Sequence, residues 1–413
     1  MSLLRRAGAA GLVLAAVGAV LAVPAGAHEP RGNPDGSPRM DLEVMVTPEL
    51  SGRLTPGGTD SRISVDGFGN RFAVARKEDV QTAVGVDQRA RTATRAAAWS
   101  WVSSDEGRTW DNLETVTRGL DGFVPQGSAR DVASGASVTL VGEALPAVVL
   151  VRRVVATSRG RLTPSTPVAV PVTVVAEELS LATDGRTALL AVVSASTTTT
   201  ARSSDGGATW APGPALEGRC DVSTAPAARR VAHAACLVGD RLVLRTSRDA
   251  GASWTSRALG SADSRIPETT PSVDTGPDGA PHVLSGMTLL RERGGRVLSQ
   301  NLATRPGRYA GASLSVSNRG RLAVGAYRQS APNEPWTVET ALFTPGKRPV
   351  WFGFADHDPT TVAGAAAPAS VGTSVDTDPQ GRLQLTWAAT YLHSEELGRP
   401  LLRNVFTIRS NTT

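Results

Sequence analysis

The chain has 413 residues, a formal net charge of +5 at pH 7 and an aromatic content of 4%. Its basic residues are scattered rather than gathered into a block, which argues against nucleic-acid binding. Beyond the N-terminal segment no stretch is long and apolar enough to cross a bilayer, which argues against an integral membrane protein. The roughly 370 residues that follow exceed an ordinary two-layer domain, so two domains or one large closed β architecture are expected.

The N-terminal segment is typical of a secretion signal. Arg5 and Arg6 precede an uncharged apolar stretch at 11–23, and the small residues Ala-Gly-Ala end at Ala27, where cleavage is expected. Retention as a membrane anchor is the alternative, which Pro24 and the cleavage sequence disfavour. We predict a signal peptide over 1–27, a flexible Pro- and Gly-rich leader over 28–39 and a single domain over 40–413, in a secreted protein.

From residue 41 onward, short runs of Val, Leu, Ala and Thr alternate with Gly, Asp, Asn and Pro turns, which is typical of β-strands. A unit of strand, Gly-containing turn and apolar strand recurs, with aligned serines at Ser64, Ser180, Ser272, Ser315 and Ser374. The first two separations are about twice the later ones, so each is expected to contain one degenerate copy, at 130–145 and at 220–238. The repeat therefore predicts seven units, each roughly the size of a four-stranded propeller blade.

These units predict an all-β fold, a β-propeller of seven blades. Six blades is the alternative, and a two-sheet sandwich is a more distant one. The last unit has three strands that end near Ile408, and the strand at 41–46 is expected to complete it. Such closure would remove the exposed sheet edges that favour aggregation.

A second repeat consists of three copies of Ser-x-Asp-x-Gly-x-Ser/Thr-Trp. In a tight hairpin, Asp accepts hydrogen bonds from backbone N–H groups, Gly adopts a positive φ, and Trp covers the loop. Three copies, each preceded by a strand, make a structural role in hairpins the expected one. The motif residues are Ser103, Asp105, Gly107, Thr109 and Trp110; Ser203, Asp205, Gly207, Thr209 and Trp210; and Ser247, Asp249, Gly251, Ser253 and Trp254.

Two cysteines occur, Cys220 and Cys236, in two strands that flank a turn near Ala228. Folding this hairpin would place them opposite each other, and an exported protein meets an oxidising environment, so we predict a disulfide. A catalytic thiol is the alternative. The spacing does not match that of a metal site.

The three hairpin motifs resemble the Asp boxes (bacterial neuraminidase repeats) of the sialidase superfamily. The resemblance covers most of the chain as a repeat pattern and is specific at the three hairpins. In that family the boxes lie between the third and fourth strands of a blade, far from the catalytic centre. The resemblance therefore implies a sialidase-like propeller and does not by itself imply sialic-acid hydrolysis.

The family's catalytic residues map onto the chain incompletely. Arg62 falls where the family has its first substrate-binding arginine, but the flanking aromatic residue and Pro are missing. Asp79 lies where the acid/base loop is expected, with compressed spacing. Tyr309 is the candidate nucleophile, displaced by about two residues, which is about 6 to 7 Å along a strand. Glu177 or Glu178 is the candidate partner carboxylate.

Arginines at the starts of inner strands suggest a second kind of site. Inner strands of a propeller converge on a central channel, and guanidinium groups there would hold a carboxylate, sulfate or phosphate. Solvated or structural arginines are the alternative, because arginine is abundant in this chain. The residues concerned are Arg62, Arg130, Arg219, Arg265 and Arg308.

No metal or cofactor is expected. The histidines are scattered, at His28, His233, His282, His357 and His393. The Asp-rich segments 274–278 and 376–378 lack a full calcium-ligand set and are interpreted as repeat turns. No Walker, dinucleotide or nucleophile-elbow motif occurs.

The leading hypothesis is a secreted sialidase-like propeller that binds an extracellular ligand or protein partner, such as an anionic glycan, without robust sialidase chemistry. The first alternative is a working exo-sialidase-like glycoside hydrolase that uses Arg62, Asp79 and Tyr309. The second is a structural protein of the cell envelope. The sequence leaves the ligand and the oligomeric state open.

Overall fold

The structure is a computed structural model. It describes residues 44–45, 61–84, 90–105, 111–112, 124–130, 136–145, 148–172, 178–225, 230–262, 270–332, 334, 336–354, 373–391 and 402–409. Within these residues the strands form seven antiparallel sheets. No helix in the same residues could span a membrane.

The first four sheets follow the chain in order. The first contains β2 (Ser61–Val65), β3 (Arg71–Val84), β4 (Ala90–Ser103) and β5 (Asp111–Asn112). The second contains β6 (Val124–Arg130), β7 (Ser137–Leu145), β8 (Val148–Ser158), β9 (Arg161–Pro164) and β10 (Val168–Val170). The third contains β11 (Glu178–Thr183), β12 (Ala188–Ser194), β13 (Thr197–Ser203), β14 (Ala211–Pro212) and β15 (Leu216–Glu217). The fourth contains β16 (Arg219–Thr224), β17 (Ala232–Val238), β18 (Arg241–Ser247) and β19 (Thr255–Ser261).

The remaining three sheets also follow the chain, except that the N-terminal strand β1 joins the seventh. The fifth contains β20 (Ser272–Thr275), β21 (Pro281–Ser285), β22 (Thr288–Arg293) and β23 (Arg296–Asn301). The sixth contains β24 (Arg308–Val316), β25 (Leu322–Gln329), β26 (Trp336–Phe343) and β27 (Phe352–Phe354). The seventh contains β28 (Ser374–Thr377), β29 (Leu383–Tyr391), β30 (Leu402–Arg409) and β1 (Val44–Met45).

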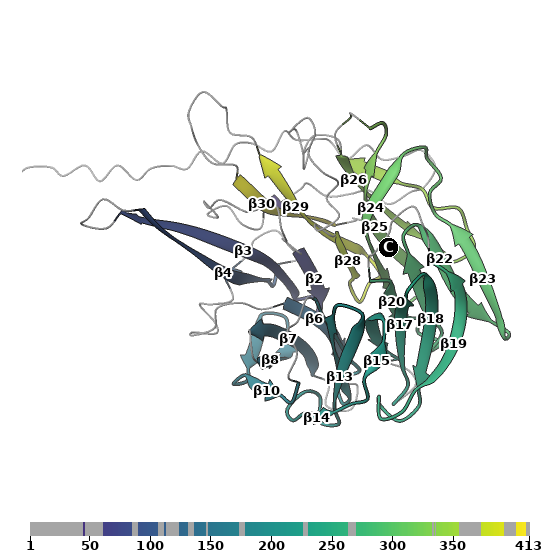
Figure 1. Cartoon of the computed structure of the whole chain (residues 1–413), viewed down its shortest axis with the longest axis horizontal. Coiled ribbons are helices and arrows are strands. Elements are labelled where there is room, and N and C mark those ends of the chain that lie inside the picture. Colours follow the sequence, from purple (N-terminus) through teal and green to yellow (C-terminus); the bar gives the residue numbers. More distant parts are fainter. Residues whose placement is uncertain are drawn as a thin grey trace, which may run out of the picture.

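The first strands of successive sheets contact one another around a closed ring. The contacts run from β2 to β6, β11, β16, β20, β24 and β28, and β28 returns to β2. Figure 1 shows the sheets following one another around a common centre. This arrangement is a β-propeller, as predicted. The apolar core lies between neighbouring sheets; Leu284 and Leu289 of the fifth sheet, for example, pack with Leu314 and Leu322 of the sixth.

The ring is closed by the N-terminal strand. In β1, Val44 pairs with Thr407 and Met45 with Phe406 of β30, so residues from both ends of the domain share the seventh sheet. The expected strand at 41–46 is thereby confirmed, although it is shorter than predicted. Hairpins also occur at both places where degenerate repeats were expected, β6–β7 and β16–β17.

The hairpin motif lies between the third and fourth strands of three sheets. In the second copy, Asp205 Oδ1 accepts hydrogen bonds from Thr209 N at 2.8 Å and Ser203 Oγ at 2.7 Å, and Oδ2 accepts one from Thr209 Oγ1 at 2.6 Å. The third copy repeats this pattern with Asp249 and Ser253. Gly251 has a φ of +83°, and a Cβ there would lie 2.4 Å from Leu189 Cδ2 of the preceding sheet, so the motif needs glycine. Of the first copy, Ser103 and Asp105 are hydrogen-bonded to each other, while Gly107, Thr109 and Trp110 lie outside the described residues.

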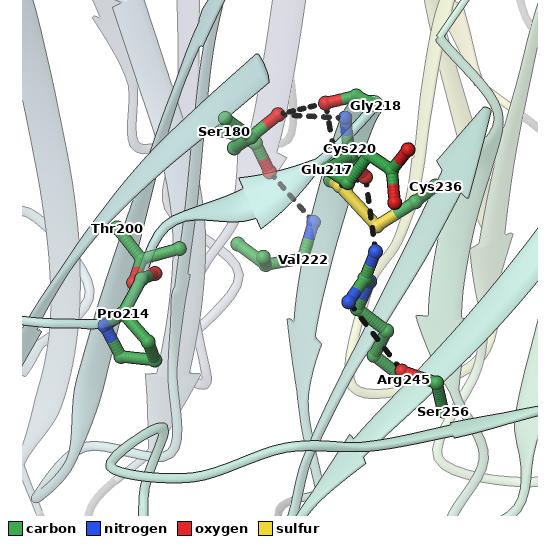
Figure 2. The surroundings of a disulfide bond; sticks show 11 residues. Ser180, Thr200, Pro214, Glu217, Gly218, Cys220, Val222, Cys236, Arg245 and Ser256 are labelled. Atoms are coloured by element: carbon green, nitrogen blue, oxygen red, sulfur yellow. Dashed lines mark hydrogen bonds between the residues drawn. A yellow bond between two sulfur atoms is a disulfide. The ribbon is translucent and has the colours of Figure 1, made fainter. Parts of the chain in front are cut away.

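The predicted disulfide is present in the β16–β17 hairpin. Cys220 and Cys236 pair directly across the two strands, with their Cα atoms 4.1 Å apart. Figure 2 shows the bond beside Arg245, whose Nη2 donates to Glu217 O at 3.1 Å. Both half-cystines are fully buried, so the disulfide lies in the core between the third and fourth sheets.

Candidate functional site

The starts of the innermost strands bring polar side chains together at one end of the ring. Glu178 begins β11, Arg219 begins β16, and Thr270 precedes β20. Glu178 Oε2 accepts a hydrogen bond from Thr270 Oγ1 at 2.6 Å and lies 3.7 Å from Arg219 Nη2. Arg219 Nη1 also donates to Ala195 O at 3.4 Å. Glu178 is therefore an anionic partner for Arg219 across neighbouring sheets. The other candidate carboxylate, Glu177, lies outside the described residues.

The predicted ring of five arginines is only partly formed. Arg62 is the second residue of β2, and Arg219 and Arg308 are the first residues of their strands. The prediction is wrong for Arg130, which ends β6; that strand starts at residue 124, so Arg130 lies at the opposite end of the strand from the expected mouth. Arg265 lies outside the described residues. Arg308 is exposed.

Tyr309, the candidate nucleophile, lies near the start of β24. The strand has a bulge between Ala310 and Ser313, which absorbs one extra residue and accounts for part of the unusual spacing in the sequence. The Tyr309 side chain is buried, and its hydroxyl donates to Arg305 O at 3.2 Å. Its ring lies 6.4 Å from that of Trp351, in a tilted arrangement.

A buried glutamate that the sequence analysis did not single out lies beside Tyr309. Glu339 of β26 has a side chain that is 1% exposed. Its Oε1 accepts from Arg328 Nε at 2.6 Å and from Arg305 Nη1 at 3.1 Å. In the residues that the structure describes, Glu339 Oε2 is buried without a hydrogen-bond partner. The signal in the sequence is the lone acidic residue within the apolar strand WTVETALF, because a buried charge requires partners.

The electrostatics of this cluster oppose ionisation of Tyr309. Burial raises the pKa of the Tyr309 phenol, and the negative charge of Glu339 raises it further; Arg328 and Arg305 act in the other direction without reversing the shift. A tyrosine nucleophile needs the opposite shift, or a carboxylate that accepts its proton directly. Here the phenol donates to a backbone carbonyl, while Glu339 Oε1 is occupied by two guanidinium groups. The cluster is therefore arranged as a structural ion-pair network.

The position of Asp79 contradicts the prediction that it lies in a loop. Asp79 is inside β3, where it pairs with Arg95 of β4. Figure 1 shows β3 and β4 running outward together as a long two-stranded arm. Strand β3 therefore continues through the segment in which we expected an acid/base loop, and this explains the compressed spacing around Asp79 in the sequence.

A second set of side chains, also missed, lies on the innermost strands. Three aspartates each accept a hydrogen bond from a backbone N–H of the following inner strand: Asp221 from Val273 at 2.7 Å, Asp274 from Val316 at 2.6 Å, and Asp376 from Val65 at 2.7 Å. Asp274 and Asp376 were interpreted as turn residues, which is wrong, because both lie within strands β20 and β28. The identical sequence Ser-Val-Asp-Thr in both strands was the available signal.

Two of these carboxylates, Asp274 and Asp376, have raised pKa values. Burial raises the pKa of Asp274, and burial raises the pKa of Asp376 to about 7 despite the hydrogen bonds that it accepts. The charge of Asp274 adds to the shift of Asp376. Ser315 Oγ, on the intervening strand, donates to Asp376 Oδ1 at 3.0 Å. Asp376 is thus an inner-strand acceptor that titrates near neutral pH.

The described residues contain no group of three or more His, Cys, Asp or Glu side chains placed to hold a metal ion. His233 and His282 are buried, and burial lowers the pKa of each imidazole. His28, His357 and His393 lie outside the part of the chain that the structure describes.

Comparison with known proteins gives similarities of fold. No protein-family model and no curated protein matches the sequence. The GH74 xyloglucanase from Xanthomonas campestris is 18% identical, with a TM-score of 0.49, and the match covers 88% of this chain but 55% of that one. The NanB sialidase from Streptococcus pneumoniae is 10% identical over 90% of this chain and 70% of its own, with a TM-score of 0.44. An α-L-arabinofuranosidase from Fusarium graminearum is 11% identical over 91% and 98%, with a TM-score of 0.40. This chain therefore spans about half the length of the xyloglucanase.

Proposed function

We propose that the chain is a secreted, sialidase-like β-propeller that binds an extracellular anionic ligand and does not hydrolyse sialosides. The observation that carries this proposal is the state of Tyr309. Its side chain is largely buried, its hydroxyl donates to Arg305 O, and the pKa of the phenol is raised, so Tyr309 is poorly suited to attack a sugar. A propeller without a poised nucleophile still offers a rigid ring of strand ends on which to build a binding surface.

Each of the seven sheets is proposed to be one blade, and the three hairpin motifs to be Asp boxes. Their position between the third and fourth strands supports this, as do the matching hydrogen bonds around Asp205 and Asp249. Secretion is proposed from the signal sequence at 1–27, and the Cys220–Cys236 disulfide is compatible with an oxidising compartment.

The proposed ligand contacts lie at the approach to β24. Arg308 is exposed, and the Arg305 side chain is 44% exposed while one of its nitrogens holds Glu339. Guanidinium groups bind carboxylate or sulfate through paired hydrogen bonds, so an anionic glycan suits this surface. Arg219 contributes less to the attraction of an anionic ligand, because the carboxylate of Glu178 partly neutralises its charge.

The test combines turnover and binding on the purified mature protein. With a fluorogenic sialoside we expect no turnover by the wild type, by Tyr309→Phe or by Arg62→Ala. With a heparin-derived hexasaccharide and with sialyllactose, each followed by calorimetry, we expect binding of at least one. That binding should weaken about tenfold in Arg308→Ala and stay unchanged in the matched control Arg161→Ala. Turnover lost in Tyr309→Phe would establish the hydrolase alternative instead, and binding unaffected by Arg308→Ala would remove the proposed site.

A further inference from the structure

A groove lies on the outer side of the seam between the fifth and sixth sheets. It has a volume of about 440 Å³. One wall is formed by β22 and β23 through Arg291, Leu298 and Ser299, and the other by the loop between β26 and β27 through Arg348 and Pro349. Figure 1 shows β23 at the outer rim of the propeller, so the groove is remote from the inner-strand ends.

The loop that forms the second wall is held in place by β23. Gln300 Nε2 donates to Lys347 O at 2.7 Å, and Gln300 Oε1 accepts from Gly346 N at 3.0 Å. Gly346 has a φ of +83°, and a Cβ there would lie 2.8 Å from Arg291 Nη2, so glycine lets this guanidinium approach the loop. The groove is therefore preformed, and a ligand would spend little free energy on ordering it.

The charges of the groove select for an acidic ligand. Arg291 and Arg348 line it, and no aspartate or glutamate does. Neither arginine has a carboxylate partner in the part of the chain that the structure describes. Leu298, which lines the groove, is 37% exposed, and Val350, the residue after Pro349, is 42% exposed. These are the exposed large hydrophobic residues of the described chain.

The groove runs beside an open sheet edge. The order of the fifth sheet is β20-β21-β22-β23, and among the described strands β23 pairs only with β22. Among the described residues, one row of its backbone N–H and C=O groups is therefore not paired with any strand. An extended peptide added to such an edge gains main-chain hydrogen bonds, and alternate side chains of the peptide face the same side of the sheet.

We propose that this groove docks an extended acidic segment of a partner protein, which adds as a strand to β23. Carboxylates on the face of that segment toward the groove would pair with Arg291 and Arg348, on the same side of the sheet as Leu298, which lies opposite Arg291 across β22 and β23. A glycan fits less well, because no aromatic side chain lines the groove to stack on a sugar ring. The site uses none of the residues of the proposed ligand surface near β24, so the two can be tested separately.

The probe is a synthetic library of capped seven-residue peptides in which Asp or Glu alternates with Val, Ile or Thr. Fluorescence anisotropy with the mature full-length protein should find members with micromolar Kd. Arg348→Glu and Arg291→Glu should each weaken binding about tenfold or more. Arg161→Glu, an equal charge reversal at an exposed position on β9, should change it less than twofold. N-methylation of alternate peptide amides should weaken binding about tenfold if main-chain pairing occurs.

Three results would overturn the proposal. One is the absence of binding by every library member. Another is binding that Arg348→Glu and Arg291→Glu leave unchanged while both variants keep the wild-type melting temperature. The third is binding of a heparin-derived hexasaccharide, lost in Arg348→Glu, without binding of any acidic peptide, which would make the groove a glycan site.

Discussion

Aspartate stabilises both the axis and the rim of this propeller, and its two environments have opposite consequences. At the axis, Asp376 accepts hydrogen bonds from Val65 N and Thr377 N, and burial raises its pKa to about 7. At the rim, Asp249 accepts from Ser253 Oγ and Ser253 N, and these bonds lower its pKa to about 2. The hydrogen bonds are similar in number and length. Burial therefore decides the sign of the shift, because it removes water from the charged form.

The comparison teaches that the two regions hold the fold in different ways. An axial aspartate bonds a backbone group of the next sheet, so its loss separates neighbouring sheets. A rim aspartate bonds residues of its own hairpin, two to four positions away, so its loss affects one loop. The seventh sheet shows this link between sheets most clearly. Asp376 and Ser374 Oγ each accept a hydrogen bond from a backbone N–H of β2, and these bonds connect the last sheet to the first.

The largest effect is expected from Asp376→Ala. This change leaves Val65 N, Thr377 N and Ser315 Oγ without their acceptor in a partly buried part of the inner strands. We expect a loss of about 3–5 kcal/mol in the free energy of unfolding. Urea denaturation followed by tryptophan fluorescence measures it, with Asp376→Asn, which keeps the shape and one acceptor, as the control. Equal stability of the alanine variant and the wild type would contradict the axial role.

A smaller effect is expected from pH. Because the pKa of Asp376 is raised in the folded state, the folded chain binds more protons than the unfolded one between pH 4 and 7. Its contribution to stability is thus complete below about pH 4 and is lost as the pH rises through about 7, a change of about 4 kcal/mol in all and of about 3 kcal/mol between pH 4.5 and 7.5. The buried His233 and His282, whose pKa values are lowered, act in the opposite direction, and the raised pKa of Asp274 acts in the same direction. The test is therefore the difference between wild type and Asp376→Asn. Urea midpoints measured from pH 4.5 to 7.5 should fall more steeply, or rise less, with pH in the wild type than in Asp376→Asn. Parallel pH profiles of the two proteins would refute the assignment.

Repetition made much of the fold predictable from the sequence. The serine-aligned units mark inner strands, the two wide separations contain the hairpins β6–β7 and β16–β17, and the strand that closes the ring is at its expected position. The facing cysteines followed from the same reasoning, since a hairpin of two short strands fixes which residues lie opposite each other. Each of these features depends on local periodicity, which a sequence carries directly.

The candidate site was less predictable, because it depends on contacts between sheets. The ion pairs of Glu339 join residues from β26, from β25 and from the segment before β24. No local sequence pattern identifies Arg305 or Arg328 as partners of this glutamate. Asp274 and Asp376 lie in strands of only four residues, each followed by a Pro-containing turn, so local reasoning assigned them to the turn. The prediction that Asp79 lies in a loop failed because strand β3 is 14 residues long and continues well beyond its partner β2.

The smallest effect is expected at the rim, from Asp205→Ala. Asp205 is exposed, so Thr209 N and Thr209 Oγ1 can bond to water once the carboxylate is gone, whereas the buried Ser203 Oγ loses an acceptor. We expect a loss of about 1 kcal/mol, measured by the urea midpoint. Ser203→Ala in the same hairpin should be more damaging, at about 2 kcal/mol, because the buried Gly207 N–H loses the hydroxyl oxygen 2.8 Å away and cannot reach water. If Asp205→Ala proved as costly as Asp376→Ala, exposure would not be what distinguishes the rim from the axis, and the hairpin would have to be a cooperative part of the ring.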